Sequence, residues 1–199
     1  MPNWCNNSIT ITHKDPAVLE ALAASVREGK FCNHIIPVPE SLQITAGRLG
    51  SDDNPEQIAL VEAEARNIAE HGYANWYDFC VNRWGTKWDI DCYAPEDAVV
   101  KEGKLSFGFD SAWAPPCGIY EAMIEQGFYV KAFYYEPGMA FCGVWEGDAE
   151  NGFFDDYCDI GGMNSKQVAE EIDPELDECM GISETIANYE EEEEENDSE

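Results

Sequence analysis

The sequence predicts an α+β protein with a ferredoxin-like split βαβ core, in which an antiparallel sheet carries helices on one face. Segments that alternate between apolar and polar residues predict strands, and amphipathic segments predict helices. Their order is β-α-β-β-α-β, interrupted by a helical insertion at residues 33–85. We therefore expect a ferredoxin-like domain over residues 1–160 and an acidic helical extension over residues 161–199.

The first two elements are a strand and a helix. Residues 8–12 alternate between hydroxyl side chains and isoleucines, which is typical of a strand with one buried face. Asp15 followed by Pro16 predicts a helix start, because the carboxylate caps free amides and proline fits the first helical position. Gly29 marks the expected end of this helix.

The insertion contains two further predicted helices. Asn54 and Pro55 repeat the start signal, and Gly72 marks the end of the longer helix. A short helix follows and ends before Gly85. The expected apolar face of the longer helix consists of Ile58, Val61, Ala65 and Ile68.

The second half of the domain predicts further strands and one helix. The helix follows the Pro115-Pro116 pair and ends at Gly127. The predicted strands lie at residues 88–93, 105–110 and 128–136, with two extra strands within residues 139–160.

The extension is strongly acidic. The chain carries 41 acidic residues against 11 lysines and arginines, a formal net charge of −30. Residues 146–199 hold 21 of these acids and one basic residue, Lys166. Weak apolar faces predict short helices in the extension. The run from Glu190 to Glu195 places like charges in a row, which predicts a disordered tail.

This charge restricts the partners of the protein. A surface of such negative charge repels phosphate backbones, so we do not expect direct binding of nucleic acid. The expected partner is basic, such as a host protein or effector complex whose own ligand is nucleic acid. The chain has no apolar run of the roughly 20 residues that span a bilayer and no signal-peptide pattern, so we expect a host-cytoplasmic protein without membrane association.

Catalytic and cofactor signals are weak. The eight cysteines have no C-x-x-C spacing, and they predict buried free thiols in a reducing compartment rather than a zinc site. No phosphate-binding glycine loop is present, and the three histidines fit no local catalytic signature. Asp155, Asp156 and Asp159 do not form a calcium-loop pattern. We therefore expect no cofactor, no metal and no enzymatic activity.

Three of the six tryptophans lie within residues 76–91. Each large aromatic side chain buries on the order of 150–250 Å², so we expect a structural role for these side chains in the interior. A binding groove is the alternative, because tryptophan also anchors interfaces. Lys87 is expected to reach Asp89 or Asp110 at the rim. The tryptophans assigned to the interior are Trp4, Trp84, Trp88 and Trp113.

Four motifs together resemble a known group. They are MPNWCNN at the start, WGTKWD at 84–89, WAPP at 113–116 and YYEPGMAFCG at 134–143. Their combination is similar to the YubB-type ferredoxin-like proteins, which conjugative plasmids and phages carry. The resemblance covers roughly residues 1–146. It implies a ferredoxin-like fold without iron–sulfur chemistry and a mobile-element setting, and it implies no catalytic mechanism.

Charge and resemblance together lead to a functional hypothesis. B-DNA carries one charge per roughly 1.7 Å of its axis, and a folded acidic surface can occupy a DNA-binding cleft in its place. We expect a nucleic-acid mimic that inhibits a host DNA- or RNA-binding defence protein. The first alternative is a non-catalytic interaction module whose acidity serves solubility, and the second is a hydrolase with an acidic metal site. The expected partner-binding residues are Asp155, Asp156, Asp159, Glu170, Glu171, Asp173, Glu175, Asp177 and Glu178.

Overall fold

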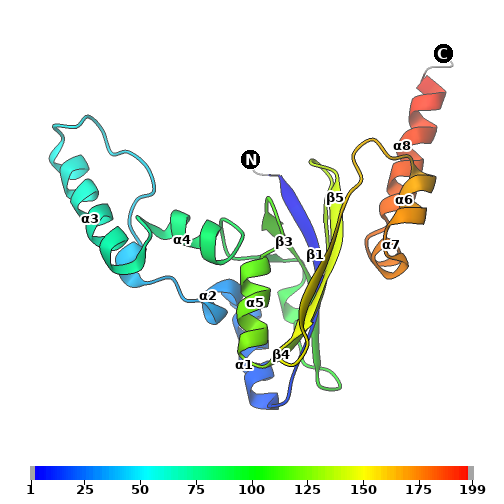
Figure 1. Cartoon of the computed structure of the whole chain (residues 1–199), viewed down its shortest axis with the longest axis horizontal. Coiled ribbons are helices and arrows are strands. Elements are labelled where there is room, and N and C mark those ends of the chain that lie inside the picture. Colours follow the sequence, from blue (N-terminus) through cyan, green and yellow to red (C-terminus); the bar gives the residue numbers. More distant parts are fainter. Residues whose placement is uncertain (1–2, 197–199) are drawn as a thin grey trace.

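The computed structural model describes residues 3–196 and contains a six-stranded antiparallel sheet with helices on both faces (Figure 1). The strand order is β2-β3-β1-β4-β5-β6. The predicted α+β class and the antiparallel sheet are confirmed. The strands are β1 (Trp4–His13), β2 (Asp91–Cys92), β3 (Lys104–Ala112), β4 (Phe128–Glu136), β5 (Phe141–Asp148) and β6 (Gly152–Asp159).

The longer helices begin where the capping signals predict. The Asp15 carboxylate accepts a hydrogen bond from the amide of Ala17, and the Asn54 side chain accepts one from the amide of Glu56. No helix in the described part of the chain is long and apolar enough to cross a membrane. The α-helices are α1 (Pro16–Arg27), α2 (Phe31–Ile35), α3 (Pro55–His71), α4 (Trp76–Arg83), α5 (Cys117–Glu125), α6 (Ser165–Glu171), α7 (Pro174–Met180) and α8 (Ile182–Asn196), and short 3-10 turns lie at Glu40–Leu42 and Pro95–Asp97.

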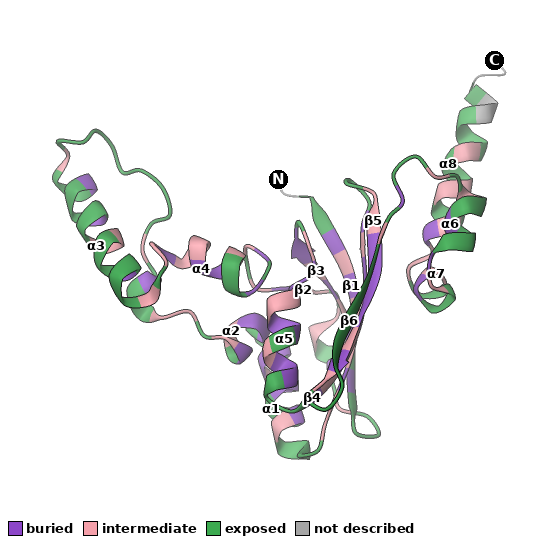
Figure 2. Cartoon of the chain, in the orientation of Figure 1, coloured by how far each residue is buried: buried purple, intermediate pink, exposed green. Residues whose placement is uncertain are grey.

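The larger core lies between the sheet and helices α1 and α5 (Figures 1 and 2). Alternation along β1 directs Ile9 and Ile11 into this core, while Ser8, Thr10 and Thr12 face the other side of the sheet. This is the orientation that the sequence pattern predicts. Other side chains buried in this core include Leu19, Leu22, Phe31, Phe109, Ile119, Tyr120, Met123, Val130 and Trp145.

A second, smaller core covers the opposite face of β4 and β5. Cys142 and Val144 of β5 point away from the α1 side and contact apolar residues of the C-terminal helices. These helices stand on that face of the sheet in Figure 1. The helical residues buried here are Val168, Ile172, Leu176 and Ile182. The extension is therefore folded onto the sheet by a core of its own.

Helix α3 differs from the sequence expectation. The predicted apolar face is exposed, with Ile58 at 47%, Val61 at 52% and Ile68 at 54% relative exposure. The buried face instead carries Leu60 and Asn67. The Asn67 amide donates to two backbone carbonyls of the surrounding loops, so polar contacts orient the helix. Figure 1 shows the reason: α3 lies in an arm that projects away from the sheet, where no second element covers its outer face.

The strand predicted at residues 88–93 is shorter in the structure, where it comprises only the two residues of β2. The Asp89 carboxylate accepts hydrogen bonds from the amides of Cys32 at 2.8 Å and Asn33 at 3.0 Å. These bonds cap the first turn of α2 and hold the segment before β2 outside the sheet ladder.

The sequence predicts a disordered glutamate-rich tail; in the described part of the chain the glutamate run is helical, and residues 197–199 lie outside the described residues. Helix α8 continues through the run to Asn196. Ile182 anchors its first turn in the second core, and the Glu190 carboxylate accepts bonds from the backbone amide and the hydroxyl of Ser165. Glutamate is also a good helix former, so an anchored helix extends into the run. The charges of Glu190 to Glu193 are thereby placed along one helix.

Candidate functional site

The predicted acidic residues of β6 point to both faces of the sheet. β6 is an edge strand, and Asp155 pairs with Trp145 while Asp156 pairs with Val144. Trp145 belongs to the large core and Val144 to the small one. Successive strand residues face opposite sides, so Asp155 lies on the α5 side and Asp156 on the side of α6 and α7.

Asp155 has a structural partner. The Tyr134 hydroxyl donates to its carboxylate across 2.6 Å, and Gly143 between them leaves room for the tyrosine ring. Burial and then this hydrogen bond raise the pKa of Tyr134 far above its usual value. Burial, with a smaller contribution from the Asp155 charge, raises the pKa of Cys117 to about 12. Asp155 therefore secures β6 to β4 across β5.

Three acids in α7 or at its start also have local roles. Asp173 caps the helix by accepting bonds from the amides of Glu175 and Leu176. Asp177 accepts a bond from the amide of Ser183 at 2.8 Å, which joins the end of α7 to the start of α8. Glu175 forms an ion pair with Lys131 of β4. These residues shape the extension before any partner is present.

The other predicted acids are exposed on the extension and β6. Two of them, Asp156 and Glu171, line a small hollow of about 80 Å³ between β6 and helices α6 and α7 together with the capping residue Asp173. The structure does not bring the nine residues into one cluster, and no group of three metal-ligating side chains suited to an ion occurs within residues 3–196. The acids outside the hollow and without a role between elements are Asp159, Glu170 and Glu178.

The structure corrects the placement of the tryptophans. Trp84 is buried at 4% exposure, as predicted, and its indole N–H donates to the carbonyl of Ile36. Trp4, Trp88 and Trp113 are 41%, 39% and 38% exposed. Trp88 stands in the loop before β2, and Trp113 stands in the turn after β3. Both positions lie beyond the ends of the strands and outside the core, so their side chains gather at the surface. The fully buried tryptophan is Trp145, which the sequence did not single out.

The exposed tryptophans form an aromatic cluster around Lys87. The Lys87 ammonium lies 4.2 Å from the ring centroid of Trp88, 5.5 Å from that of Tyr77 and 5.6 Å from that of Trp113. Trp4 extends the cluster, with its ring 6.2 Å from that of Trp88. Lys87 therefore makes cation–π contacts.

The predicted reach of Lys87 to Asp89 or Asp110 is absent, because both carboxylates have other donors. Asp110 accepts from Asn6 at 2.7 Å and Tyr93 at 2.6 Å, and Asp89 caps α2. Burial raises the pKa of Asp89 although backbone amides act in the opposite direction. Sequence reasoning missed Tyr77 as a member of the cluster, and it also missed Trp76, whose ring lies 6.0 Å from that of Tyr77, although both stand in the tryptophan-rich segment at residues 76–91.

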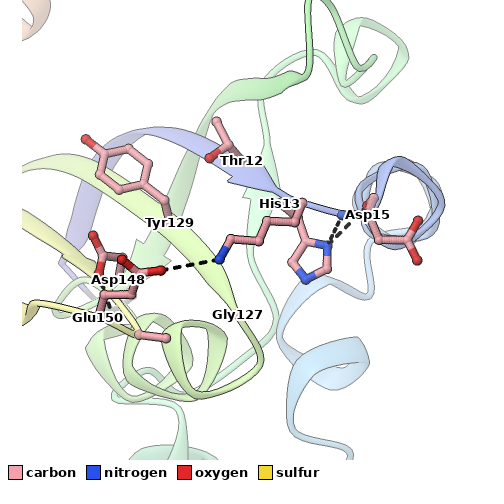
Figure 3. A pocket seen from close by; sticks show the side chains of 9 residues that line it. Thr12, His13, Asp15, Gly127, Tyr129, Asp148 and Glu150 are labelled. Carbon is pink, nitrogen blue, oxygen red and sulfur yellow. Dashed lines mark hydrogen bonds and ion pairs between the residues drawn. The ribbon is translucent and has the colours of Figure 1, made fainter.

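Another hollow lies at the other end of β1 and measures about 630 Å³ (Figure 3). Lys14 reaches Glu150 across 3.3 Å at its rim, and both side chains are mostly exposed. Hydrogen bonds from the side chain and backbone of Asn151 lower the pKa of Asp148. These polar groups form hydrogen bonds and an ion pair with one another, and an exposed ion pair contributes little to stability. We therefore assign no functional site to this hollow.

Comparisons with known proteins provide little further information. No family model matches the chain, and no curated protein matches it. One solved structure is similar, a crystal structure of a protein api92 from Yersinia pseudotuberculosis, assigned to the family DUF1281. It shares 12% identity with this chain at a TM-score of 0.41, and the match covers 81% of this chain and 99% of that one.

Proposed function

We propose that this protein is an acidic accessory protein of a phage or plasmid that acts as a nucleic-acid mimic in the host cytoplasm. It inhibits a host DNA- or RNA-binding defence protein by occupying its basic cleft, without catalysis. The observation that supports this proposal most directly is the second core, which holds α6, α7 and the start of α8 against β4 and β5. Carboxylates on a folded scaffold keep fixed spacings, which a mimic of a regular polyanion needs.

The structure distinguishes two groups of acids within the predicted set. Asp155, Asp173, Glu175 and Asp177 bind other parts of the chain. The five remaining acids are exposed, and we assign the partner contact to them, although Glu170 pairs with Lys166 one turn away and Asp159 accepts from the amide of Gly161. They are Asp156, Asp159, Glu170, Glu171 and Glu178. The exposed glutamates of α8 extend this acidic face toward the C-terminal end of the described chain.

A ferredoxin-like core is part of this proposal. The order β2-β3-β1-β4 supports it, because β1 lies between β3 and β4 and is antiparallel to both. Helix α1 follows β1, and α5 connects β3 to β4 on the same face. Strands β5 and β6 then extend the sheet beyond the split βαβ unit.

An interaction module whose acidity serves solubility is the second candidate. The observation that favours it is the structural use of four of the nine predicted acids, which shows that part of the acidity stabilises the fold. The two candidates differ in whether exposed acids of the extension bind a basic protein more strongly than acids elsewhere.

The test is affinity capture from a host lysate at low salt, with elution by salt and by competing DNA. Neutralising the five exposed acids to their amides should abolish capture of a basic nucleic-acid-binding protein. That capture should weaken strongly between about 50 and 300 mM salt, as screening shortens the Debye length. The matched control neutralises five exposed arm acids: Glu40, Asp52, Glu56, Glu62 and Glu70. Equal loss with both sets, or no basic protein captured, contradicts the mimicry proposal.

A further inference from the structure

The ammonium of Lys87 is an unusual cation in this chain. Lys87 has no ion-pair partner among residues 3–196, and neither do five other lysines and arginines, but those five are exposed whereas Lys87 is not: Arg27, Arg66, Arg83, Lys101 and Lys104. Lys87 is half-buried, and three aromatic rings surround it. Rings attract the cation but leave its N–H donors without acceptors. A ligand with an anionic group would supply those acceptors.

The surrounding aromatic side chains are not explained by core packing. Trp88 and Trp113 each keep more than a third of their surface exposed. Trp113 also has a φ of +73°, the left-handed region that a bulky residue rarely adopts. Its amide donates to the carbonyl of Asn3, which holds the turn in this conformation. A strained, exposed aromatic residue beside an unpaired cation is typical of a ligand site.

Two adjoining hollows provide room for a ligand. One of about 420 Å³ is lined by Ala46, Trp76, Tyr77, Lys87, Trp88 and Trp113. Its size lies in the range of small-molecule sites. The second, of about 170 Å³, shares Trp76, Lys87 and Trp88 and adds the amide side chains of Asn33 and Gln43. The hollows therefore combine flat aromatic surfaces, one cation and two side-chain amides. The second hollow also includes the Asp89 carboxylate, whose oxygens accept hydrogen bonds from the amides of Cys32 and Asn33.

We propose that this aromatic cluster binds a mononucleotide, with its base stacked on the ring of Trp113, bordered by Tyr77, whose ring stands at 87° to that of Trp113, and with its phosphate at the Lys87 ammonium. Bases stack on aromatic side chains whatever their sequence, and lysine binds phosphate as a point charge. Side-chain amides such as those of Asn33 and Gln43 match the donors and acceptors of a base edge.

The net charge selects a single nucleotide over a strand. At −30, the protein repels each additional phosphate, whereas one phosphate group is offset locally by Lys87. The site lies beside α4 at the β2–β3 half of the sheet, and the C-terminal helices cover β4 and β5. It is therefore independent of the proposed polyanion mimicry, and either proposal can fail without the other.

The test is a titration of the full chain with adenosine monophosphate, followed through the indole N–H signals in NMR spectra. The signals of Trp88 and Trp113 should shift, while that of the buried Trp145 should not. Adenosine and inorganic phosphate should each bind more weakly than adenosine monophosphate. A deoxyadenylate hexamer that binds more tightly overturns the choice of a mononucleotide.

Two variants test which side chains contribute to nucleotide binding. Lys87→Met keeps the aliphatic stem but removes the charge, and Trp113→Ala removes one ring. Each should weaken binding on the order of tenfold or more, the scale of one charged hydrogen bond or one stacked base. Lys104→Met, at the other end of β3, is the matched charge control and should bind as the wild type does. Absence of binding by the wild type, or unchanged affinity in a folded Lys87→Met variant, overturns the proposal.

Discussion

Tyr134 of β4 donates its hydroxyl to the carboxylate of Asp155 on β6 across 2.6 Å, so a single hydrogen bond spans the intervening strand β5. Tyr134 is buried at 1% exposure. The bond therefore forms where the core meets the edge of the sheet, and it makes an acidic residue part of the fold.

Replacing Asp155 with alanine should destabilise the protein, because the buried Tyr134 hydroxyl loses its acceptor. We expect a loss of about 1–3 kcal/mol in the free energy of unfolding, measured by urea denaturation. Asp156→Ala, on the opposite face of the same strand, is the control and should change this value by less than about 0.5 kcal/mol. Equal effects of the two substitutions would contradict the assigned role of Asp155.

Gly143 should tolerate no side chain. A Cβ atom at this position would meet the Tyr134 hydroxyl and the backbone carbonyl of Asp156, so Gly143→Ala forces the ring or the strand to move. We expect destabilisation of about 1–3 kcal/mol by overpacking, measured as a lower denaturation midpoint. Gly161→Ala, where a Cβ would meet only the flexible Asp159 side chain, is the comparison. A Gly143→Ala protein as stable as Gly161→Ala would refute this packing.

The left-handed backbone of Trp113 can be tested with two small residues. Glycine adopts this conformation without strain, whereas alanine does not, so Trp113→Gly should be more stable than Trp113→Ala by about 1 kcal/mol. In an ordinary extended or helical position the order is reversed. Thermal or chemical unfolding of the two variants decides between these orders, and greater stability of the alanine variant would show that φ at this position is not positive.

Two thiols, of the buried Cys142 and the half-buried Cys117, should make the protein sensitive to alkali. Burial raises the pKa of Cys117 and of Cys142 to about 12, above the value of about 8.5 for an exposed thiol. The folded state therefore favours the neutral thiol, and its stabilising contribution is complete below about pH 8.5 and lost as the pH rises toward 12. The free energy of unfolding should fall over this window.

The matched variants for this pH dependence are Cys117→Ser and Cys142→Ala, measured beside the wild type. Removing a titrating thiol should flatten the decline in stability, even where the substitution lowers stability at neutral pH. An unchanged slope in both variants would show that other groups, such as the buried tyrosines, cause the alkaline loss.

Local patterns predicted the elements well, and tertiary context decided where their faces point. The Asp15 and Asn54 caps and the alternation of residues 8–12 depend on near neighbours, so the sequence was sufficient. The apolar stripe of α3 was assigned to the interior because hydrophobic periodicity does not reveal whether another element covers the face. The same limitation affected Trp88 and Trp113, which end up on the surface.

The acidic residues show a different limit. The number of acidic residues can be read from the sequence. The contacts of Asp155 with Tyr134 and of Asp177 with Ser183 cannot, because these pairs depend on strand register and helix packing. The accumulation of acids in the extension was visible from composition. The division of those acids into structural and exposed groups required the three-dimensional arrangement.

Strand β6 leaves a row of backbone donors and acceptors at the rim of the sheet, flanked by the exposed rings of Phe153, Phe154 and Tyr157. Such a border invites another chain to add a strand, the first step toward fibrillar aggregation. Asp155, Asp156 and Asp159 place negative charges on this edge strand. If two copies paired along β6, these charges would lie against the same charges of the second copy. We therefore expect the acids on β6 to oppose edge-to-edge pairing between copies of the chain.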